Sequence, residues 1–373
     1  MNIGIPNESL KNENRVALTP VAVASLVQAG HSVLIESAAG NLSRFDDESY
    51  RTVGGTIVYS KEEIIRRSDM VCGVEPPTME EIEMMDPGKI TLNFLNLPVA
   101  RPQFFDALLG GKISSAGYEL IETEDGDRPV LHSMSEIAGQ MSIIIAARYL
   151  EADGKGRGIT IGGISGVAPA AVVVLGAGVV GTEAARTAAG LGAQVIVLDT
   201  DLKRLRNIES LLSKRVTTAL ATPMIIQKSV AYADVLVGAV FIKGGRTPHV
   251  VTEEMVKSMK PGAVIVDVSI DQGGCVETSR PTTLRDPAFV LHDVIHYCVP
   301  NITATVARTA TYALTNTLLP YVNEIASLGI EKALRHDGSL AKGICSLGGQ
   351  CTNQLAGRIF GKEVSAIERL LVG

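Results

Sequence analysis

The feature that most constrains this chain is the run from Ala170 to Gly181, Ala-Ala-Val-Val-Val-Leu-Gly-Ala-Gly-Val-Val-Gly. Its apolar half predicts a buried strand, and three glycines with G-x-G-x-x-G spacing predict a tight turn into a helix. A second apolar stretch follows and closes on Asp199, 18 residues after Gly181. Strand, glycine turn, helix and an acid-terminated second strand together predict a dinucleotide-binding unit.

Each glycine of the turn has a distinct physical role. Gly176 permits the tight turn, Gly178 lets the backbone approach a pyrophosphate, and Gly181 lets the helix pack closely on the strand. The N–H groups and the positive dipole at the start of the helix would hold the anion. Asp199 is expected to accept hydrogen bonds from a ribose 2′-hydroxyl and to repel a 2′-phosphate, which favours NAD over NADP. The alternative is that the glycines only shape a turn.

Length and composition bound the class of protein. A chain of 373 residues is long enough for about two domains. Hydrophobic residues make up 46 % and charged residues 20 %, so sizeable cores can be buried. The net charge of −6 gives no basic footprint, which argues against a nucleic-acid partner or an anionic membrane. No apolar run reaches the ~18 to 20 residues of a membrane span.

The cysteines and the first residues indicate the compartment. Five cysteines, an odd number without a C-x-x-C pair, are typical of idle thiols under reducing conditions. Cys298 as a nucleophile is the alternative, although no motif surrounds it. The segment Met1–Pro6 predicts a strand rather than a signal peptide. No Cys/His/Asp cluster has metal-ligand spacing, so we expect a cytoplasmic enzyme without a metal.

Short apolar strands alternate with helical patterns, which predicts parallel, doubly wound sheets. Two long helices are expected, one opened by a capping box at Ser133–Glu136 and running to about Leu150, the other from Thr303 to about Leu328. The predicted fold class is therefore α/β, with two doubly wound Rossmann-like domains separated by a cleft and joined by these helices. Ligands are expected at the carboxyl ends of both sheets, facing one another across the cleft.

Five further segments make the chain recognisable: Gly4–Glu8, Asn14–Pro20, Met134–Gly139, Val266–Cys275 and Thr311–Asn316. With the glycine turn, they resemble the alanine dehydrogenase/pyridine nucleotide transhydrogenase α-subunit family over nearly the whole chain. The later segments look closer to the alanine dehydrogenases. The resemblance implies a substrate domain from residues 1–130 and 305–373, an NAD domain from residues 131–304, and a homohexamer.

The resemblance also implies a reaction and the residues that perform it. In the family's reversible oxidative deamination, hydride passes from the substrate α-carbon to the nicotinamide, and water hydrolyses the imine. The substrate groups are an arginine, a lysine, a histidine and an aspartate. Arg15 and Asp271 fit the arginine and the aspartate, and Asp271 is expected to end a strand at the crevice of the sheet. Glu75 stands where the resemblance puts the lysine, and Asn96 stands where it puts the histidine.

These two exchanges predict altered chemistry. Replacing a cation by an anion changes the local charge by two units, and each unit interaction at a few Å is worth on the order of several kcal/mol at an effective dielectric of about 20. Asn96 can donate to a carbonyl, but it cannot shuttle a proton at neutral pH as a histidine does. We therefore expect Glu75 to receive a substrate ammonium or guanidinium, and ordinary alanine deamination to be weak or absent.

Three functional interpretations stay open from the sequence. The first is an NAD-dependent dehydrogenase or imine reductase acting on an altered amino acid, such as a cationic or diamino acid. The second is reductive condensation of a keto acid with an amine, or cyclodeamination. The third is a catalytically inactive NAD-binding protein that serves as a sensor or assembly partner.

Other candidate residues lie at predicted strand ends. Tyr118 and Glu119 are candidates for lining the substrate site, and His132, His292 and His296 are candidates for the missing acid, with packing or surface roles as the alternative. The residues expected to contact the cofactor are Ser135, Gly176, Gly178, Val179, Val180, Gly181, Asp199, Ala239, Val240, Ile270, Val299 and Asn301.

Overall fold

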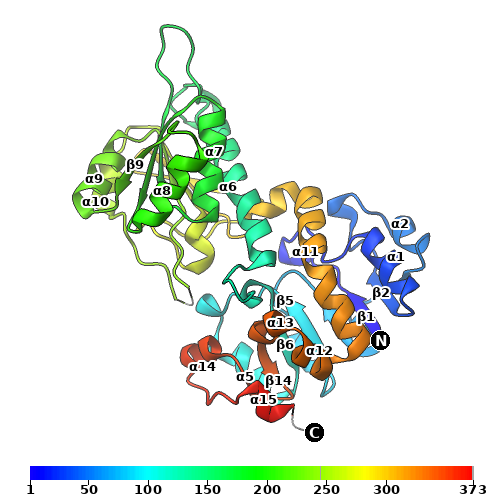
Figure 1. The fold of residues 1–373 in the computed structure, drawn as a ribbon. Helices are drawn as coiled ribbons and strands as arrows, with labels where there is room; N and C mark the ends of the chain where they lie inside the picture. Colours follow the sequence, from blue (N-terminus) through cyan, green and yellow to red (C-terminus); the bar gives the residue numbers. More distant parts are fainter. Residues whose placement is uncertain (244, 372–373) are drawn as a thin grey trace. The chain divides into compact units, whose positions relative to one another are not determined.

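The computed structural model describes residues 1–243 and 245–371 and divides into two compact units. Unit 1 contains Met1–Met134 and Ala304–Gly373, and unit 2 contains Ser135–Thr303 (Figure 1). The chain passes from one unit to the other inside helix α6 (Pro129–Tyr149) and in the short helix η7 (Ile302–Val306). The cleft expected between the units stays a prediction.

Unit 1 is built on a sheet that has eight strands within the described residues. Strand β1 lies between β4 and β2, so the strand order reverses beside β1. The strands from β6 to β3 pair in parallel, whereas β14 is antiparallel to β6 and β15 is antiparallel to β14. In sheet order the strands are β15 (Gln350–Cys351), β14 (Ile344–Leu347), β6 (Ser114–Gly117), β5 (Ile90–Asn93), β4 (Met70–Cys72), β1 (Asn2–Ile5), β2 (Ser32–Glu36) and β3 (Thr56–Val58).

Unit 2 is built on a sheet that has seven strands within the described part of the chain. Strand β7 lies between β10 and β8, which puts a second reversal of strand order beside β7. All pairs are parallel except the hairpin of β12 and β13. In sheet order the strands are β12 (Ala288–Leu291), β13 (Val294–Tyr297), β11 (Val264–Asp267), β10 (Val235–Gly238), β7 (Ala171–Leu175), β8 (Gln194–Asp199) and β9 (Thr217–Leu220).

Helices cover both faces of each sheet, and the core of unit 2 shows why β7 is apolar throughout. Val172 and Val174 belong to the core on one face, together with residues of α6, α7 (Val179–Gly190) and α8 (Leu202–Leu211). Val173 and Leu175 belong to the core on the other face, together with residues of α9 (Pro223–Tyr232) and α10 (Glu253–Lys257). A strand buried on both faces reads as a continuous apolar run rather than an alternating one. The predicted class, α/β with two doubly wound Rossmann-like domains, is confirmed.

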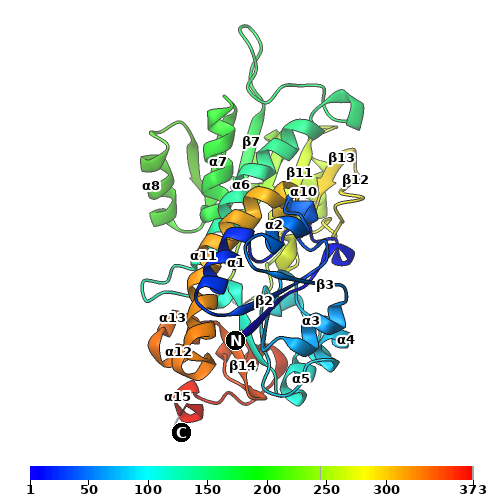
Figure 2. The ribbon, with the colours of Figure 1, turned by 90° about the vertical axis from the view of Figure 1, so that its right-hand side faces the viewer.

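Several helices begin where the sequence places a cap. Thr19 accepts from the N–H of Ala22 ahead of Pro20, and Thr78 forms a reciprocal capping box with Glu81. Helices α1 and α11 lie side by side in unit 1 (Figures 1 and 2). The helices are α1 (Pro20–Gln28), α2 (Asp47–Arg51), α3 (Lys61–Arg67), α4 (Met79–Glu83), α5 (Pro102–Gly110), α7 (Val179–Gly190), α8 (Leu202–Leu211), α9 (Pro223–Tyr232), α10 (Glu253–Lys257), α11 (Ala307–Leu328), α12 (Ile330–His336), α13 (Gly338–Gly343), α14 (Gln354–Phe360) and α15 (Ile367–Leu370).

The predicted starts of both long helices were wrong. Helix α6 begins at Pro129, and Ser133 lies inside it with its hydroxyl donating to the carbonyl of Val130 at 3.0 Å, so Ser133 caps nothing. Proline at the first helical position is the start signal that the capping-box pattern obscured. The second long helix, α11, begins at Ala307, directly after the 3-10 helix η7.

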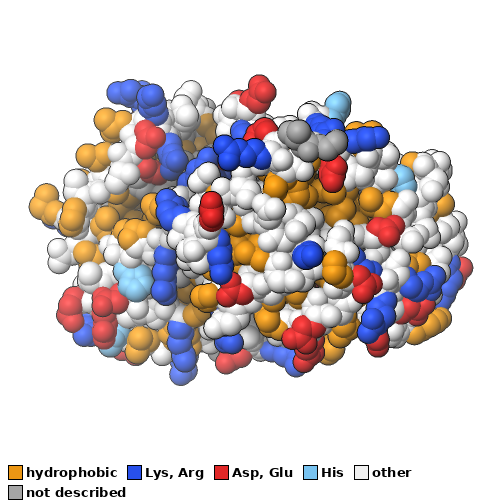
Figure 3. Space-filling view, turned by 90° about the horizontal axis from the view of Figure 1, so that it is seen from below, with side chains coloured by type: hydrophobic (Ala, Val, Ile, Leu, Met, Phe, Trp, Pro, Cys, Tyr) orange, Lys and Arg blue, Asp and Glu red, His pale blue; other side chains and the backbone are white. Residues whose placement is uncertain are grey.

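Helix α6 packs closely on α7. A Cβ on Gly139 would lie 2.4 Å from the carbonyl oxygen of Val180, so glycine lets the two helices touch (Figure 2). By length and composition, α6 is the one helix within the described residues that could cross a membrane. Core helices of globular proteins have the same length and composition, which makes this weak evidence of a span. On the face shown in Figure 3, Lys and Arg side chains are interspersed with Asp and Glu.

Candidate functional site

The glycine turn of unit 2 follows β7, at the reversal of strand order beside β10. Gly176 has φ +104°, and a Cβ there would lie 2.3 Å from the carbonyl oxygen of Ala239. A Cβ on Gly181 would lie 1.8 Å from the carbonyl oxygen of Gly176. Both glycines are therefore required by the backbone itself, because a side chain at either place would force main-chain atoms apart.

Gly178 differs from the other two glycines. It is the N-cap of α7, and no side chain caps that helix. A Cβ on Gly178 would meet nothing within 4 Å, so the space beside its backbone is open. The N–H groups of Val179 and Val180, in the first turn of a 12-residue helix, have no partners within that helix. An open backbone at a helix N-terminus fits a dinucleotide pyrophosphate.

Asp199 ends β8 and is fixed by the backbone around the turn. One carboxylate oxygen accepts from the N–H of Ala177 at 2.6 Å, and the other accepts from the N–H of Asp201 at 2.8 Å. The side chain of Arg204 lies 3.9 Å from the same carboxylate. The carboxylate is thus held beside the glycine turn, where the remaining lone pairs can accept ribose hydroxyls.

We expect Asp199→Ser to weaken NAD binding by about 10- to 100-fold, because hydrogen bonds to a charged group contribute about 1.5–3 kcal/mol. NADP binding should become tighter than in the unchanged protein, because Arg204 would then face a 2′-phosphate without the competing carboxylate. Fluorescence titration with both nucleotides measures the two changes, and Asp201→Ser is the neighbouring control. Equal NAD and NADP affinity in the unchanged protein would contradict the role of Asp199.

The other candidate cofactor residues lie in loops that follow strands of the same sheet. Ala239 and Val240 follow β10, whereas Ile270 lies in the 3-10 helix η6 (Val268–Gln272) that follows β11. The Ser269 hydroxyl donates to the carbonyl of Val240 at 2.8 Å, which ties these two loops together. Val299 and Asn301 come after β13.

Two expectations in unit 2 need correction. Ser135 is not at a helix N-terminus, because α6 begins six residues earlier at Pro129. Asp271 does not end a strand. It lies in η6, four residues after the last residue of β11. Buried Asp267 positions this region by accepting from the N–H groups of Cys275 and Val276 at 3.0 and 3.2 Å. Sequence reasoning missed Asp267, although it lies in the quoted segment Val266–Cys275.

In unit 1 the candidate substrate residues gather at the carboxyl edge of the sheet. Arg15 is 6 % exposed, and its Nε and Nη2 donate to the two carboxylate oxygens of Glu13 at 2.8 and 2.7 Å. The Sδ atom of Met134 lies 3.5 Å from Nη1. A guanidinium held this firmly presents a fixed positive charge rather than a mobile surface side chain.

Glu75 lies beside Arg15 and is only 27 % exposed, with 3.9 Å between its Oε1 and Arg15 Nη2. The pKa of Glu75 is raised from 4.5 to about 8, chiefly by burial and also by the carboxylates of Glu13 and Glu8, whereas Arg15 lowers it. With Arg15 as the cation beside it, the carboxyl of Glu75 is therefore mostly protonated at pH 7. The expected change of two charge units is reduced to about one at this pH.

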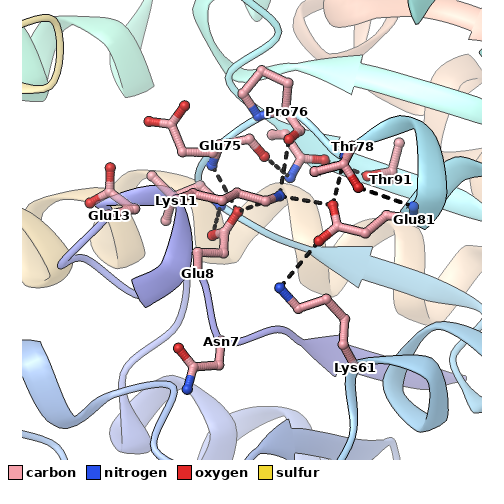
Figure 4. Close-up of polar contacts among 12 residues, drawn as sticks. Asn7, Glu8, Lys11, Glu13, Lys61, Glu75, Pro76, Thr78, Glu81 and Thr91 are labelled. Atoms are coloured by element: carbon pink, nitrogen blue, oxygen red, sulfur yellow. Dashed lines mark hydrogen bonds and ion pairs between the residues drawn. The ribbon is translucent and has the colours of Figure 1, made fainter.

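Three side chains hold the main chain of Glu75 in place (Figure 4). Glu8 accepts from the N–H groups of Val74 and Glu75 at 2.6 and 3.1 Å, and Asn93 donates to the carbonyl of Glu75 at 2.8 Å. Lys11 donates to the carbonyl of Pro76 at 3.1 Å. We call Glu8, Lys11 and Asn93 the cradle of Glu75.

The cradle has its own charge balance. Burial raises the pKa of Glu8 to about 7, and the ammonium of Lys11, 3.5 Å away, opposes that rise. Lys11 also pairs with Glu81 at 2.8 Å, and Lys61 pairs with Glu81 at 3.2 Å. The ammonium of Lys11 approaches the loop of Glu75, but it bonds the carbonyl of Pro76 and the carboxylate of Glu81. Sequence reasoning missed all three cradle residues, although Glu8 lies in the quoted segment Gly4–Glu8.

Asn96 follows β5 and takes a left-handed conformation with φ 48°. Its N–H donates to Glu119 at 2.8 Å, and the N–H of Leu95 donates to the same carboxylate at 3.1 Å. Burial raises the pKa of Glu119. The ring of Tyr118 packs edge-on against Phe94. Glu119 and Tyr118 therefore support the loop that carries Asn96.

The three candidate histidines have other partners. His132 is 42 % exposed and bonds Asp127 at 2.9 Å, and His292 bonds Glu253 at 2.8 Å. His296 is fully buried against Thr278, and burial lowers its pKa to about 4. None of these contacts joins a histidine to Arg15 or Glu75. Within residues 1–243 and 245–371, no group of three or more His, Cys, Asp or Glu side chains could hold a metal ion.

The glycine turn, the uncapped helix and the fixed carboxylate of Asp199 define a protein of the dinucleotide-binding class with two Rossmann-like units. Residues 4–138 match the N-terminal domain of the alanine dehydrogenase/PNT family, and residues 142–354 match its C-terminal domain. The chain belongs to the alanine dehydrogenase/PNT family. It is an NAD-dependent oxidoreductase of the amino-acid dehydrogenase type.

Relatives and solved structures cover essentially the whole chain. The chain is 44 % identical over 372 residues to an alanine dehydrogenase of Methanococcus maripaludis, with 100 % of both chains covered. It is 41 % identical to an alanine dehydrogenase of Bacillus subtilis, covering 100 % of this chain and 98 % of that one. A solved L-alanine dehydrogenase superposes with a TM-score of 0.90 at 41 % identity, covering 97 % of this chain and 99 % of that one.

Proposed function

We propose that this protein is an NAD-dependent dehydrogenase that oxidises the CH–NH2 group of an amino acid other than alanine, one that carries a second cationic group. Unit 1 would hold the substrate through Arg15 and Glu75. Unit 2 would hold NAD at the glycine turn, with Asp271 near the nicotinamide. The bound nicotinamide supplies the acceptor for hydride from the substrate α-carbon.

The observation that carries this proposal is Glu75, fixed by its cradle beside the Arg15 guanidinium. Glu13 holds the guanidinium of Arg15 in place through Nε and Nη2, and this fixed positive charge would attract a substrate carboxylate. A substrate ammonium within a few Å of Glu75 would favour its ionised form and displace its proton. A substrate with a second cationic group thus has one more positive charge than alanine to pair with this carboxylate.

The test is a panel of amino acids, diamino acids and keto acid plus amine pairs, each followed by NADH absorbance. We expect a diamino acid to exceed alanine in kcat/KM by at least about tenfold, which corresponds to about 1.4 kcal/mol. Efficient oxidation of alanine by the unchanged protein would overturn the proposed substrate class. Oxidation of NADH only with a keto acid and an amine together would favour reductive condensation instead.

A double variant, Glu75→Lys with Asn96→His, should gain alanine activity, by about tenfold or more. The reason is that Glu8 and Glu13 would balance the charge of a lysine at position 75, while a histidine at position 96 could transfer protons near neutral pH. NADH formation from alanine measures the gain. Either single variant alone should gain less, and an unchanged rate in the double variant would argue against the assigned positions.

The same proposal extends to location and assembly. We expect the protein to act in the cytoplasm, because all five cysteines are buried free thiols. We expect a homohexamer, as the family resemblance implies, and light scattering in solution measures the mass.

A further inference from the structure

We propose that Glu75 is the residue that transfers protons during the reaction, and that the cradle of Glu8, Lys11 and Asn93 positions it for this role. The inference rests on the proposed oxidation of an amino acid. It answers which group acts in place of the histidine that the resemblance puts at position 96. Glu75 would be a catalytic residue, and the cradle residues would be positioning residues.

The main chain of Glu75 is fixed by hydrogen bonds, whereas its side-chain carboxyl group lies apart from them. Its N–H, its carbonyl and the next carbonyl along the chain are bonded by Glu8, Asn93 and Lys11 respectively. In Figure 4 its carboxyl group points away from these bonds, toward the side of Glu13. A catalytic side chain needs this arrangement, with a main chain that cannot shift and a carboxyl that substrate can reach.

The charged groups around Glu75 favour reversible protonation. Glu13 and Arg15 face it from the loop before α1, Glu8 faces it from the end of β1, and Lys11 lies beyond Glu8. The neighbouring carboxylate of Glu13 raises the pKa of Glu75 and so favours its protonated form. Burial places the pKa of Glu75 at about 8, close to the pH at which an acid and base both work efficiently.

The proton steps balance as follows. The Glu75 carboxylate takes a proton from the substrate α-ammonium and releases it to solvent, so the nitrogen lone pair can form the C=N bond when hydride leaves the α-carbon. Water then adds to that carbon, and its proton passes to Glu75. Glu75 gives this proton to the nitrogen as the C–N bond breaks and ammonia leaves. The proton of the remaining hydroxyl group then passes through Glu75 to ammonia. The products are the keto acid and ammonium, together with the one proton that was released to solvent in the first step.

The first test is Glu75→Gln, which keeps the shape of the side chain but cannot transfer a proton. Loss of general acid–base catalysis lowers kcat by about 10²- to 10⁴-fold. In the unchanged protein, kcat/KM for deamination should rise with pH through an apparent pKa near 8, because kcat/KM reports the free enzyme and the carboxylate form of Glu75 is the base. The variant should lack this rise. Glu80→Gln, at an exposed glutamate of α4, is the matched control and should change neither kcat nor its pH profile.

Two further measurements separate catalysis from folding. Formate added to Glu75→Ala should restore part of the rate, because a small carboxylate can occupy the vacated space. Because folding raises the pKa of this carboxyl, its protonated form stabilises the folded protein. This contribution to the free energy of unfolding is fully present below about pH 4.5 and is lost as the pH rises through about 8. The melting temperature of Glu75→Gln, relative to the unchanged protein, should therefore rise between pH 5 and pH 9.

The cradle is tested through Lys11. Lys11→Met should lower kcat by about tenfold with little change in KM, and Lys11→Arg should recover most of the loss by bonding the carbonyl of Pro76 again. An unchanged kcat in Lys11→Met would overturn the positioning role. If Glu75→Gln keeps the rate and the pH rise of the unchanged protein, proton transfer by Glu75 is wrong while the proposed function stands. If the unchanged protein turns over no substrate of the panel, both are wrong.

Discussion

Arg15→Met should lower kcat/KM for the amino-acid substrate by about 10²- to 10³-fold. Arg15 is buried and already holds Glu13 through two short bonds, and it offers the fixed positive charge that a substrate α-carboxylate needs. Truncating one partner of a buried, hydrogen-bonded charge pair in a complex costs about 2–5 kcal/mol of binding free energy, and each 1.4 kcal/mol is a factor of ten. Steady-state kinetics with NAD in excess measure the loss.

The same variant has a consequence for pH. Arg15 lowers the pKa of Glu75, so its removal should move the rise of kcat/KM with pH to a higher pH. Arg15→Lys should retain part of the activity, because it keeps the charge and loses the planar fork. Arg66→Met removes an exposed arginine paired with Glu62 on α3, and it should leave kcat/KM unchanged. A loss in Arg66→Met as large as in Arg15→Met would indicate a general effect of removing positive charge.

The glycine turn could be predicted because its determinants are local. A strand buried on both faces, three glycines and an acid at the next strand end all lie between Ala170 and Asp199. In the structure, each position requires glycine for a different reason. Gly176 has a positive φ, the backbone of Gly178 is open to approach, and Gly181 lies in contact with a backbone oxygen. Local spacing carries such information because each requirement concerns atoms only a few residues apart, or the neighbouring strand.

Short or polar strands escaped prediction. Strand β9 (Thr217–Leu220) has an exposed residue at each end, so it lacks the apolar run that marks its neighbours. Strand β12 ends at Leu291, and the chain turns through His292 and Asp293, both with positive φ, into β13. Residues of this type tolerate left-handed conformations less readily than glycine, so the sequence contains no turn signal there.

The cradle of Glu75 could not be predicted because it depends on sheet order. Glu8 follows β1 and Glu75 follows β4, and the two meet only because β1 and β4 are neighbours in the sheet. The contacts join residues 66 and 67 positions apart, and Asn93 enters from the end of β5. The sequence indicated that Glu75 lies at a strand end. It did not show the order in which the strands pair. The neighbours that raise the pKa of Glu75 could therefore not be predicted.

Three alanine variants in and after the glycine turn should separate folding from NAD binding. Gly181→Ala should destabilise the protein by about 1–3 kcal/mol or more and abolish measurable NAD binding, because its Cβ would lie 1.8 Å from a backbone oxygen. Gly178→Ala should fold with an unchanged melting temperature, because its Cβ meets nothing within 4 Å. It should nevertheless weaken NAD binding by at least about tenfold, since the methyl group would occupy the space through which a pyrophosphate approaches the backbone.

Gly190→Ala is the matched control for both variants. Gly190 is the last residue of α7, and a Cβ there also meets nothing within 4 Å. The substitution should leave NAD affinity unchanged and raise stability by up to about 1 kcal/mol, since alanine favours the helix over glycine. Thermal unfolding and NAD titration of the three variants give the two readouts. If Gly178→Ala binds NAD as tightly as Gly190→Ala, the pyrophosphate does not lie against the start of α7, and the open backbone at Gly178 only shapes the turn.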